Sequence, residues 1–192
     1  MKNKLIFIVV FMFLSANIFS QISEAKTVFP DSWLGEYQGT MYILSAKRNT
    51  IDSVDVKFEF SETEIVNRWH YKMTYQNTKF GEIIKDYEIV KPDSLNQNNY
   101  LLDEKDGIII QSTLMGNTLY SNFIVSGTLQ CSILCKVGDD LYFEVTTSKD
   151  EYTLSTQNSP KNNEQSFIVD SYPPFTTQFV RFVKIQEDSQ SE

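Results

Sequence analysis

The 192-residue chain has few of the residues from which metal centres and disulfide frameworks are built. It contains one histidine and two cysteines. A single histidine excludes the multi-histidine sites typical of zinc, copper and non-haem iron enzymes. The sequence also lacks a Gly-x-Ser-x-Gly elbow, a phosphate-binding loop and a dinucleotide fingerprint. No catalytic residue, metal site or cofactor is therefore predicted.

The first 20 residues have the features of a cleavable export signal. Lys2 and Lys4 provide a positive start, Leu5–Leu14 is unbroken and apolar, and Ser20 offers the small residue that precedes cleavage before Gln21. A transmembrane anchor is the alternative, but a span needs ~20 apolar residues and polar residues interrupt this run. We expect a signal peptide over 1–20 and a soluble periplasmic or extracellular product.

Basic residues are outnumbered by acidic ones. Seventeen Lys and Arg against 25 Asp and Glu give a formal net charge of −8. The signal peptide holds two lysines and no acid, so the mature charge is −10. A chain this acidic has no long-range attraction for nucleic acid or anionic lipid. The expected partners are therefore neutral, apolar or cationic, and a small hydrophobic ligand belongs to this class. The sequence identifies no protein partner.

The dominant hydrophobic period of the mature chain is two. Apolar and polar residues alternate along 54–60, 69–75 and 129–137, which is typical of strands with one buried face. Turn sequences such as 103–107 and 138–140 separate these runs. The expected strands lie near residues 33–44, 53–60, 66–76, 82–91, 99–104, 107–114, 118–126, 128–137, 140–148 and 176–185.

Such a meander removes its two edges when the first strand pairs with the last. The sequence therefore predicts a single all-β domain over 21–192, an antiparallel up-and-down meander of about 8–10 strands closed into a barrel. A two-sheet β-sandwich is the alternative. One polar stretch, 149–165, breaks the rhythm and is predicted to be a long loop, either disordered or a lid.

The residues expected to face inward are mostly aromatic. They are Tyr37, Met41, Phe58, Phe60, Tyr71, Met73, Tyr75, Tyr87, Phe123 and Phe143. One interpretation is ordinary core packing. The other is a ligand cavity in which apolar side chains provide the contact area and tyrosine hydroxyls provide a few polar contacts.

Cys131 and Cys135 are four residues apart in one predicted strand. At the rise of a strand they are ~13 Å apart. That separation is beyond the reach of a disulfide. We expect two reduced, buried thiols that pack as small hydrophobic side chains.

The remaining polar candidates favour structural roles. His70 shares a strand face with Arg68 and Lys72, so it is expected outside the barrel. The acidic cluster at 103–106 includes Lys105 where a calcium loop needs an oxygen ligand, which favours a solvated turn. Carboxylates that match paired-acid chemistry by type alone are Glu36, Glu59, Asp86, Glu88 and Glu144.

The segment 33–39, Trp-Leu-Gly-Glu-Tyr-Gln-Gly, resembles the opening strand of lipocalin-like (calycin) barrels. Arg181 is similar to the basic residue that stacks on the tryptophan in that group. The resemblance implies that Trp33, Gly35 and Arg181 form the barrel base through a cation–π contact. The stretches 67–69, 86–88, 103–108 and 123–127 are similar to those of uncharacterised exported bacterial proteins of this type.

By fold analogy, we expect an exported, non-enzymatic barrel that binds a small apolar or amphipathic ligand such as a lipid or fatty acid. One alternative is a protein-interaction or inhibitor module with a filled core and a working 149–165 loop. A second alternative is a cofactor-independent enzyme, such as an isomerase or hydrolase. That alternative requires an inward charged residue with a perturbed pKa.

Overall fold

The computed structural model describes residues 28–47, 51–94, 96–159 and 165–186. The predicted signal peptide, 1–20, lies outside these residues. The chain divides into two units, 1–32 and 33–192. In the described part of the first unit, the Ser32 amide donates a hydrogen bond to the Val28 carbonyl at 3.0 Å. A short 3-10 helix spans Asp31–Trp33.

Among the described residues, no helix has the length and apolar character needed to cross a membrane.

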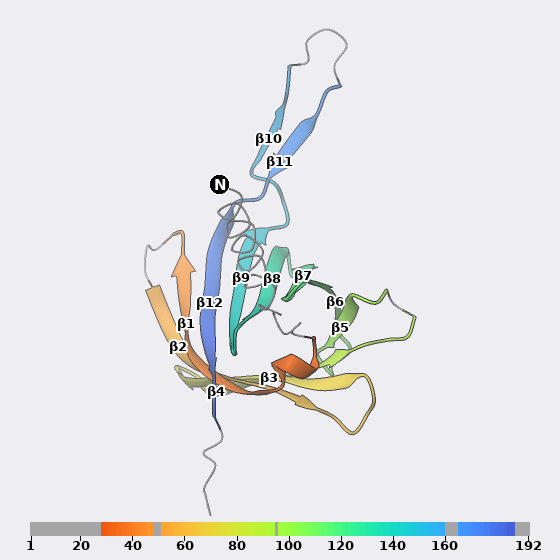
Figure 1. Ribbon diagram of the computed structural model, residues 1–192. Coiled ribbons are helices and arrows are strands. Elements are labelled where there is room, and N and C mark those ends of the chain that lie inside the picture. Colours follow the sequence, from red (N-terminus) through yellow and green to blue (C-terminus); the bar gives the residue numbers. More distant parts are fainter. Residues whose placement is uncertain (1–27, 48–50, 95, 160–164, 187–192) are drawn as a thin grey trace, which may run out of the picture. The chain divides into compact units, whose positions relative to one another are not determined.

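The second unit is built on a closed antiparallel barrel of ten strands (Figure 1). The strands are β1 (Gly35–Ser45), β2 (Ile51–Glu62), β3 (Arg68–Thr78), β4 (Gly81–Val90), β5 (Asn99–Asp103), β6 (Ile109–Met115), β7 (Thr118–Val125), β8 (Thr128–Val137), β9 (Asp140–Lys149) and β12 (Pro174–Lys184). Chain neighbours pair in order, and β12 closes the barrel by pairing with both β9 and β1. The predicted all-β meander closed into a barrel is confirmed.

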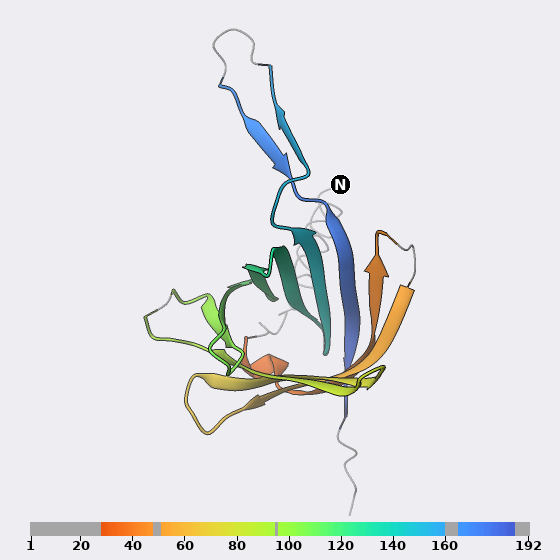
Figure 2. The ribbon, with the colours of Figure 1, turned by 180° about the vertical axis from the view of Figure 1, so that it is seen from behind.

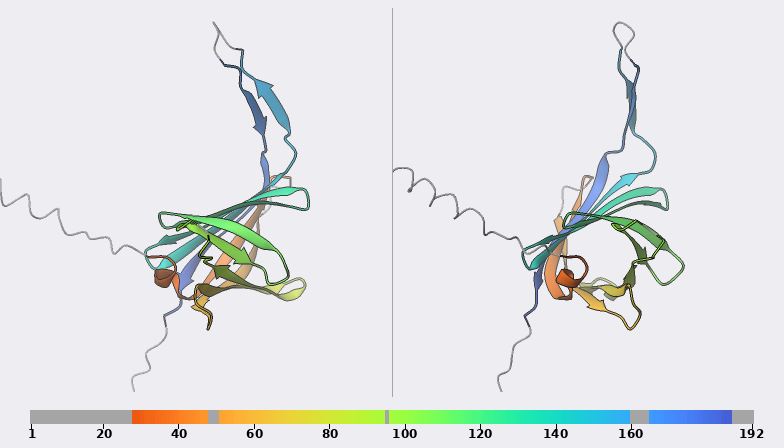
Figure 3. Two further views of the ribbon diagram at one scale, coloured as in Figure 1. Left: turned by 90° about the vertical axis from the view of Figure 1, so that its right-hand side faces the viewer. Right: turned by 45° about the vertical axis from the view of Figure 1, so that its right-hand side comes forward.

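A two-stranded hairpin extends the chain between β9 and β12 (Figure 2). Its strands are β10 (Leu154–Gln157) and β11 (Ile168–Ser171), and Leu154 lies opposite Ser171. The prediction of a long loop over 149–165 is therefore wrong at β10. Polar side chains suggested a loop, but backbone hydrogen bonds between two strands do not depend on an apolar face. The hairpin projects away from the barrel in both views of Figure 3.

The faces of β8 are inverted relative to the sequence prediction. Leu134 and Lys136 are buried on the inner face, whereas Cys131 and Cys135 are half-buried on the outer face. Both thiols are free, as predicted, but the prediction that they are buried is wrong. Pairing explains the inversion, because Leu134 lies opposite buried Leu119 on β7, and paired residues share a face.

Pairing between β4 and β5 is short. Only Glu88–Val90 of β4 pair with β5, whereas β4 pairs with β3 along its whole length. The β5–β6 turn is instead attached to β4 by ion pairs, in which Lys105 Nζ lies 2.9 Å from Asp86 and 3.5 Å from Glu88. Backbone pairing is therefore replaced by side-chain contacts along this part of the barrel wall.

Candidate functional site

One end of the barrel interior is filled. We call it the closed end, where β1 begins and β12 ends. Trp33, Tyr37, Met41 and Phe182 have no measurable exposure there. Phe58 lies at the centre of an aromatic cluster, with ring centroids 4.8 Å from Tyr71, 5.4 Å from Phe182 and 6.0 Å from Tyr37. These side chains pack against each other, which leaves the closed end without room for a ligand.

Two lysines complete the closed end. The amino groups of Lys136 and Lys184 lie 5.8 and 5.9 Å from the centre of the Tyr37 ring. The Lys136 amine donates a hydrogen bond to the Asp139 carbonyl and the Lys184 amine donates to the Leu34 carbonyl. The Tyr37 hydroxyl donates to the Trp33 carbonyl at 2.7 Å. Cation–π contacts and carbonyl hydrogen bonds thus satisfy two amines at this end.

Burial is the main cause of the pKa shifts of Tyr37 and Lys136. It raises the pKa of Tyr37 to about 12, with a smaller contribution from the charges of Asp139 and Asp140. Burial also lowers the pKa of Lys136, and the neighbouring Lys184 charge lowers it further. Lys136 is thus an inward charged residue with a perturbed pKa, as the enzyme alternative requires. It does not line the cavity described below, so it gives no support to catalysis there.

Arg181 does not belong to the barrel base, and the expected stacking on Trp33 is wrong. Its side chain is 61% exposed and pairs with the Asp140 carboxylate at 2.6 Å on the outside of the barrel. Its neighbours Val180 and Phe182 are buried, so alternation along β12 turns Arg181 outward. Lys184 supplies the cation at the base instead. Gly35 makes room for it, because a Cβ there would lie 2.6 Å from Lys184 Cε.

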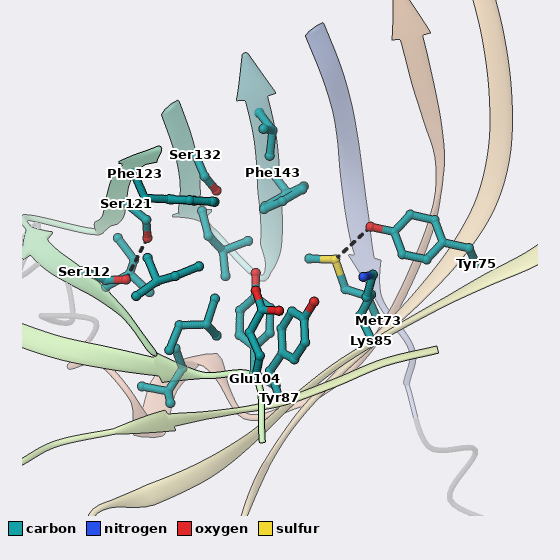
Figure 4. A pocket seen from close by; sticks show the side chains of 17 residues that line it. Met73, Tyr75, Lys85, Tyr87, Glu104, Ser112, Ser121, Phe123, Ser132 and Phe143 are labelled. Atoms are coloured by element: carbon teal, nitrogen blue, oxygen red, sulfur yellow. Dashed lines mark hydrogen bonds between the residues drawn. The ribbon is translucent and has the colours of Figure 1, made fainter. Parts of the chain in front are cut away.

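The middle of the barrel contains an internal cavity of about 180 Å³. Six of the ten residues expected to face a ligand line it, namely Tyr71, Met73, Tyr75, Tyr87, Phe123 and Phe143 (Figure 4). Ile89, Leu119 and Leu134 also line the cavity and are buried. The other four predicted residues, Tyr37, Met41, Phe58 and Phe60, are fully packed and do not line the cavity.

A row of serines forms one wall of the cavity. Ser112, Ser121 and Ser132 line it from three adjacent strands, β6, β7 and β8. The hydroxyls of Ser112 and Ser121 are 2.7 Å apart and share a hydrogen bond, and Ser132 lies opposite Ser121 in the strand register. This row gives an otherwise apolar chamber a group of neutral donors and acceptors.

Three tyrosines form the facing wall from β3 and β4. Burial raises the pKa of Tyr71, Tyr75 and Tyr87, and it is the largest cause of the shift in each. Glu104 also raises the pKa of Tyr87 through its charge and a side-chain hydrogen bond. All three hydroxyls are therefore neutral at physiological pH and keep the proton that a hydrogen-bond donor needs.

A wider space lies next to the cavity at the opposite end of the barrel, which we call the open end. This space measures about 580 Å³ and includes Ile43, Val54 and Ile83. Tyr75 and Lys85 line both spaces. An apolar cavity of about 150 Å³ can hold a benzene-sized molecule, so the inner cavity suits one ring or a short chain. A larger ligand would extend past Tyr75 and Lys85 into the wider space.

The serine row, Lys85 and Glu104 were missed as cavity residues by sequence reasoning. The polar members of β8 were assigned to the outer face because its apolar members are more numerous. Alternation on β4 places Lys85 on the same face as Tyr87, so that signal was present in the sequence. Pairing of Met73 with Lys85 establishes that both face inward.

The other polar candidates lie outside the cavity. His70 is on the outer face of β3, opposite Ser61 and Glu88, as alternation predicts. Asp103 and Asp106 cap backbone amides of the β5–β6 turn, at Lys105 and Ile108. That arrangement accounts for the acidic cluster as turn chemistry.

Comparison with known proteins gives a fold relationship alone. No family model matches the chain, and no curated protein matches it. A solved structure from Nostoc punctiforme, described as a protein of unknown function from the DUF3598 family, is similar with a TM-score of 0.53 at 9% identity. The match covers 81% of this chain and 48% of that one, so this chain spans about half the length of its neighbour.

Proposed function

We propose that the protein is an exported, non-enzymatic barrel that binds a small amphipathic molecule in its interior. The observation that supports this function is the cavity, which has aromatic and aliphatic walls, a serine row and a wider space next to it at the open end. Ligand pockets of this kind combine apolar lining with a few placed polar groups. The signal peptide predicted over residues 1–20 supports a role outside the cytoplasm.

Native mass spectrometry of the mature protein, purified without detergent, tests this function. An adduct of a few hundred daltons, or uptake of a member of a lipid panel, is the expected result. A bare mass that no lipid or fluorescent apolar probe changes would contradict it.

Two substitutions on opposite faces of β7 test whether the ligand binds in the cavity. F123A removes a cavity side chain, whereas Y120A removes an aromatic from the outer face of the same strand. F123A should weaken binding and Y120A should not. Equal effects of the two variants would place the ligand elsewhere.

A protein-interaction module is the second candidate, and the hairpin supports it. Leu154, Phe167 and Val169 lie on one face of β10–β11 and are 57–58% exposed. Exposed apolar patches of this kind occur at interaction sites. Replacing all three residues with serine and titrating the variant with the fluorescent apolar probe separates the two candidates. If the cavity binds the ligand, probe binding by this variant is unchanged.

A further inference from the structure

Lys85 is a cation on the inner face of β4. It lies opposite Met73, which is only 3% exposed, and it shares its face with Tyr87 and Ile89. It is also the only basic residue among those lining the inner cavity, and it stands where this cavity meets the wider space. Its amine is therefore within reach of a molecule occupying either space.

Lys85 takes part in none of the ion pairs formed by the described residues. The cations on the outer face of the same wall differ in this respect. Lys105 pairs with Asp86, Arg68 pairs with Glu88, and Lys72 lies 3.7 Å from Glu59. The Lys85 side chain is exposed, and its amine lies 6.0 Å from the centre of the Tyr87 ring. An anion held in the cavity beside this amine would gain a charge-assisted hydrogen bond.

A hydroxyl donor accompanies this amine. Tyr75 follows Met73 on the same face of β3, and its hydroxyl donates to the Met73 sulfur at 3.7 Å. Thioether sulfur is a weak acceptor, so an oxygen anion would attract this donor more strongly. Figure 4 shows Met73, Lys85 and Tyr75 together along one part of the cavity wall.

Glu104 supplies the opposite charge in the same cavity. Its charge helps to raise the pKa of Tyr87, and it forms no ion pair with Lys85 among the described residues. The cavity lining therefore contains one carboxylate, Glu104, and one amine, Lys85, that do not pair with each other. A ligand anion gains at Lys85 and is repelled at Glu104, which fixes the orientation of an amphipathic acid.

We infer that the ligand is an amphipathic carboxylic acid, whose carboxylate binds Lys85 and Tyr75 and whose apolar part occupies the inner cavity. This inference rests on the proposed function and names the chemical class of its ligand. The open-end space beyond Lys85 accommodates any part of the molecule that the inner cavity cannot hold.

The test uses two fluorescent probes that differ only in charge, dansyl-aminoundecanoic acid and its methyl ester. The wild-type protein should bind the acid about ten-fold more tightly than the ester, the size expected for a charge-assisted contact. K85M should remove this difference, and K85R should retain it. K57M is the matched control, because Lys57 is exposed on the outer face of β2.

Three results overturn the inference. Equal affinity of wild type for acid and ester would refute the acid preference while leaving the cavity function intact. An unchanged preference in K85M would show that another group binds the carboxylate. Binding of neither probe to wild type would contradict the inference together with the proposed function. Circular dichroism of K85M and K85R establishes that both variants are folded.

Discussion

The closed end and the cavity of this barrel have similar aromatic content and opposite packing. At the closed end, Phe58 contacts aromatic rings on several sides and is 1% exposed. In the cavity, Phe123 is half-buried and faces empty space. The difference lies in the facing strands, because β6, β7 and β8 contribute serines at the height of the cavity. Small side chains opposite large ones create a chamber, whereas large side chains opposite each other fill it.

The largest expected effect is at the closed end. F58A should lower the free energy of unfolding by about 3–5 kcal/mol, because it leaves a cavity in a filled core. F123A should lower the free energy of unfolding by clearly less, because the neighbours of Phe123 already border the empty cavity. Urea denaturation of both variants measures the difference. Equal losses would show that the two regions are packed alike.

Alkaline pH provides an intermediate effect through Tyr37. Its folded pKa of about 12 lies above the usual value of 10, so the unfolded chain loses this proton first as pH rises. The resulting stability is complete below pH 10 and is lost as pH rises toward 12. Y37F should therefore reduce the fall in unfolding free energy over this window.

At neutral pH, Y37F should cost about 1 kcal/mol because the hydrogen bond to the Trp33 carbonyl is lost. Urea denaturation at a series of pH values measures both effects. An unchanged slope between pH 10 and 12 would contradict the assignment of Tyr37 as a buried, titrating group.

The smallest expected effect is on the outer surface. K105M breaks the contacts with Asp86 and Glu88, at the point where backbone pairing between β4 and β5 ends. Exposed ion pairs contribute little, so the loss should stay below about 1 kcal/mol and should diminish in high salt. A loss of several kcal/mol, independent of salt, would mean that this turn belongs to the core.

Sequence reasoning succeeded where a strand has one clearly apolar face. The alternation on β2 and β3 correctly placed Phe58, Tyr71 and Met73 inside. It failed on β8 and β12, where both faces carry apolar residues and only pairing with neighbouring strands decides which face is buried. The positions of Cys131 and Arg181 were wrong for this reason.

The division between filled and empty interior could not be predicted from alternation alone. Tyr37 and Tyr75 have the same residue type and the same inward direction, yet Tyr37 is in the packed core and Tyr75 is in the cavity. The two tyrosines differ in the size of the side chains that face them across the barrel. The register between strands determines which side chains these are, and the sequence of a single strand does not contain it.

The central claim is that the ligand occupies the cavity beside the serine row, and not the closed end or the outer face of the barrel. The most direct measurement compares probe binding by S132F with binding by C131F, which adds the same side chain to the outer face of β8. Because Ser132 lines the cavity, a phenyl ring there fills much of the 180 Å³. We predict that S132F remains folded and loses binding while C131F binds as wild type does. Undiminished binding by folded S132F would contradict the claim.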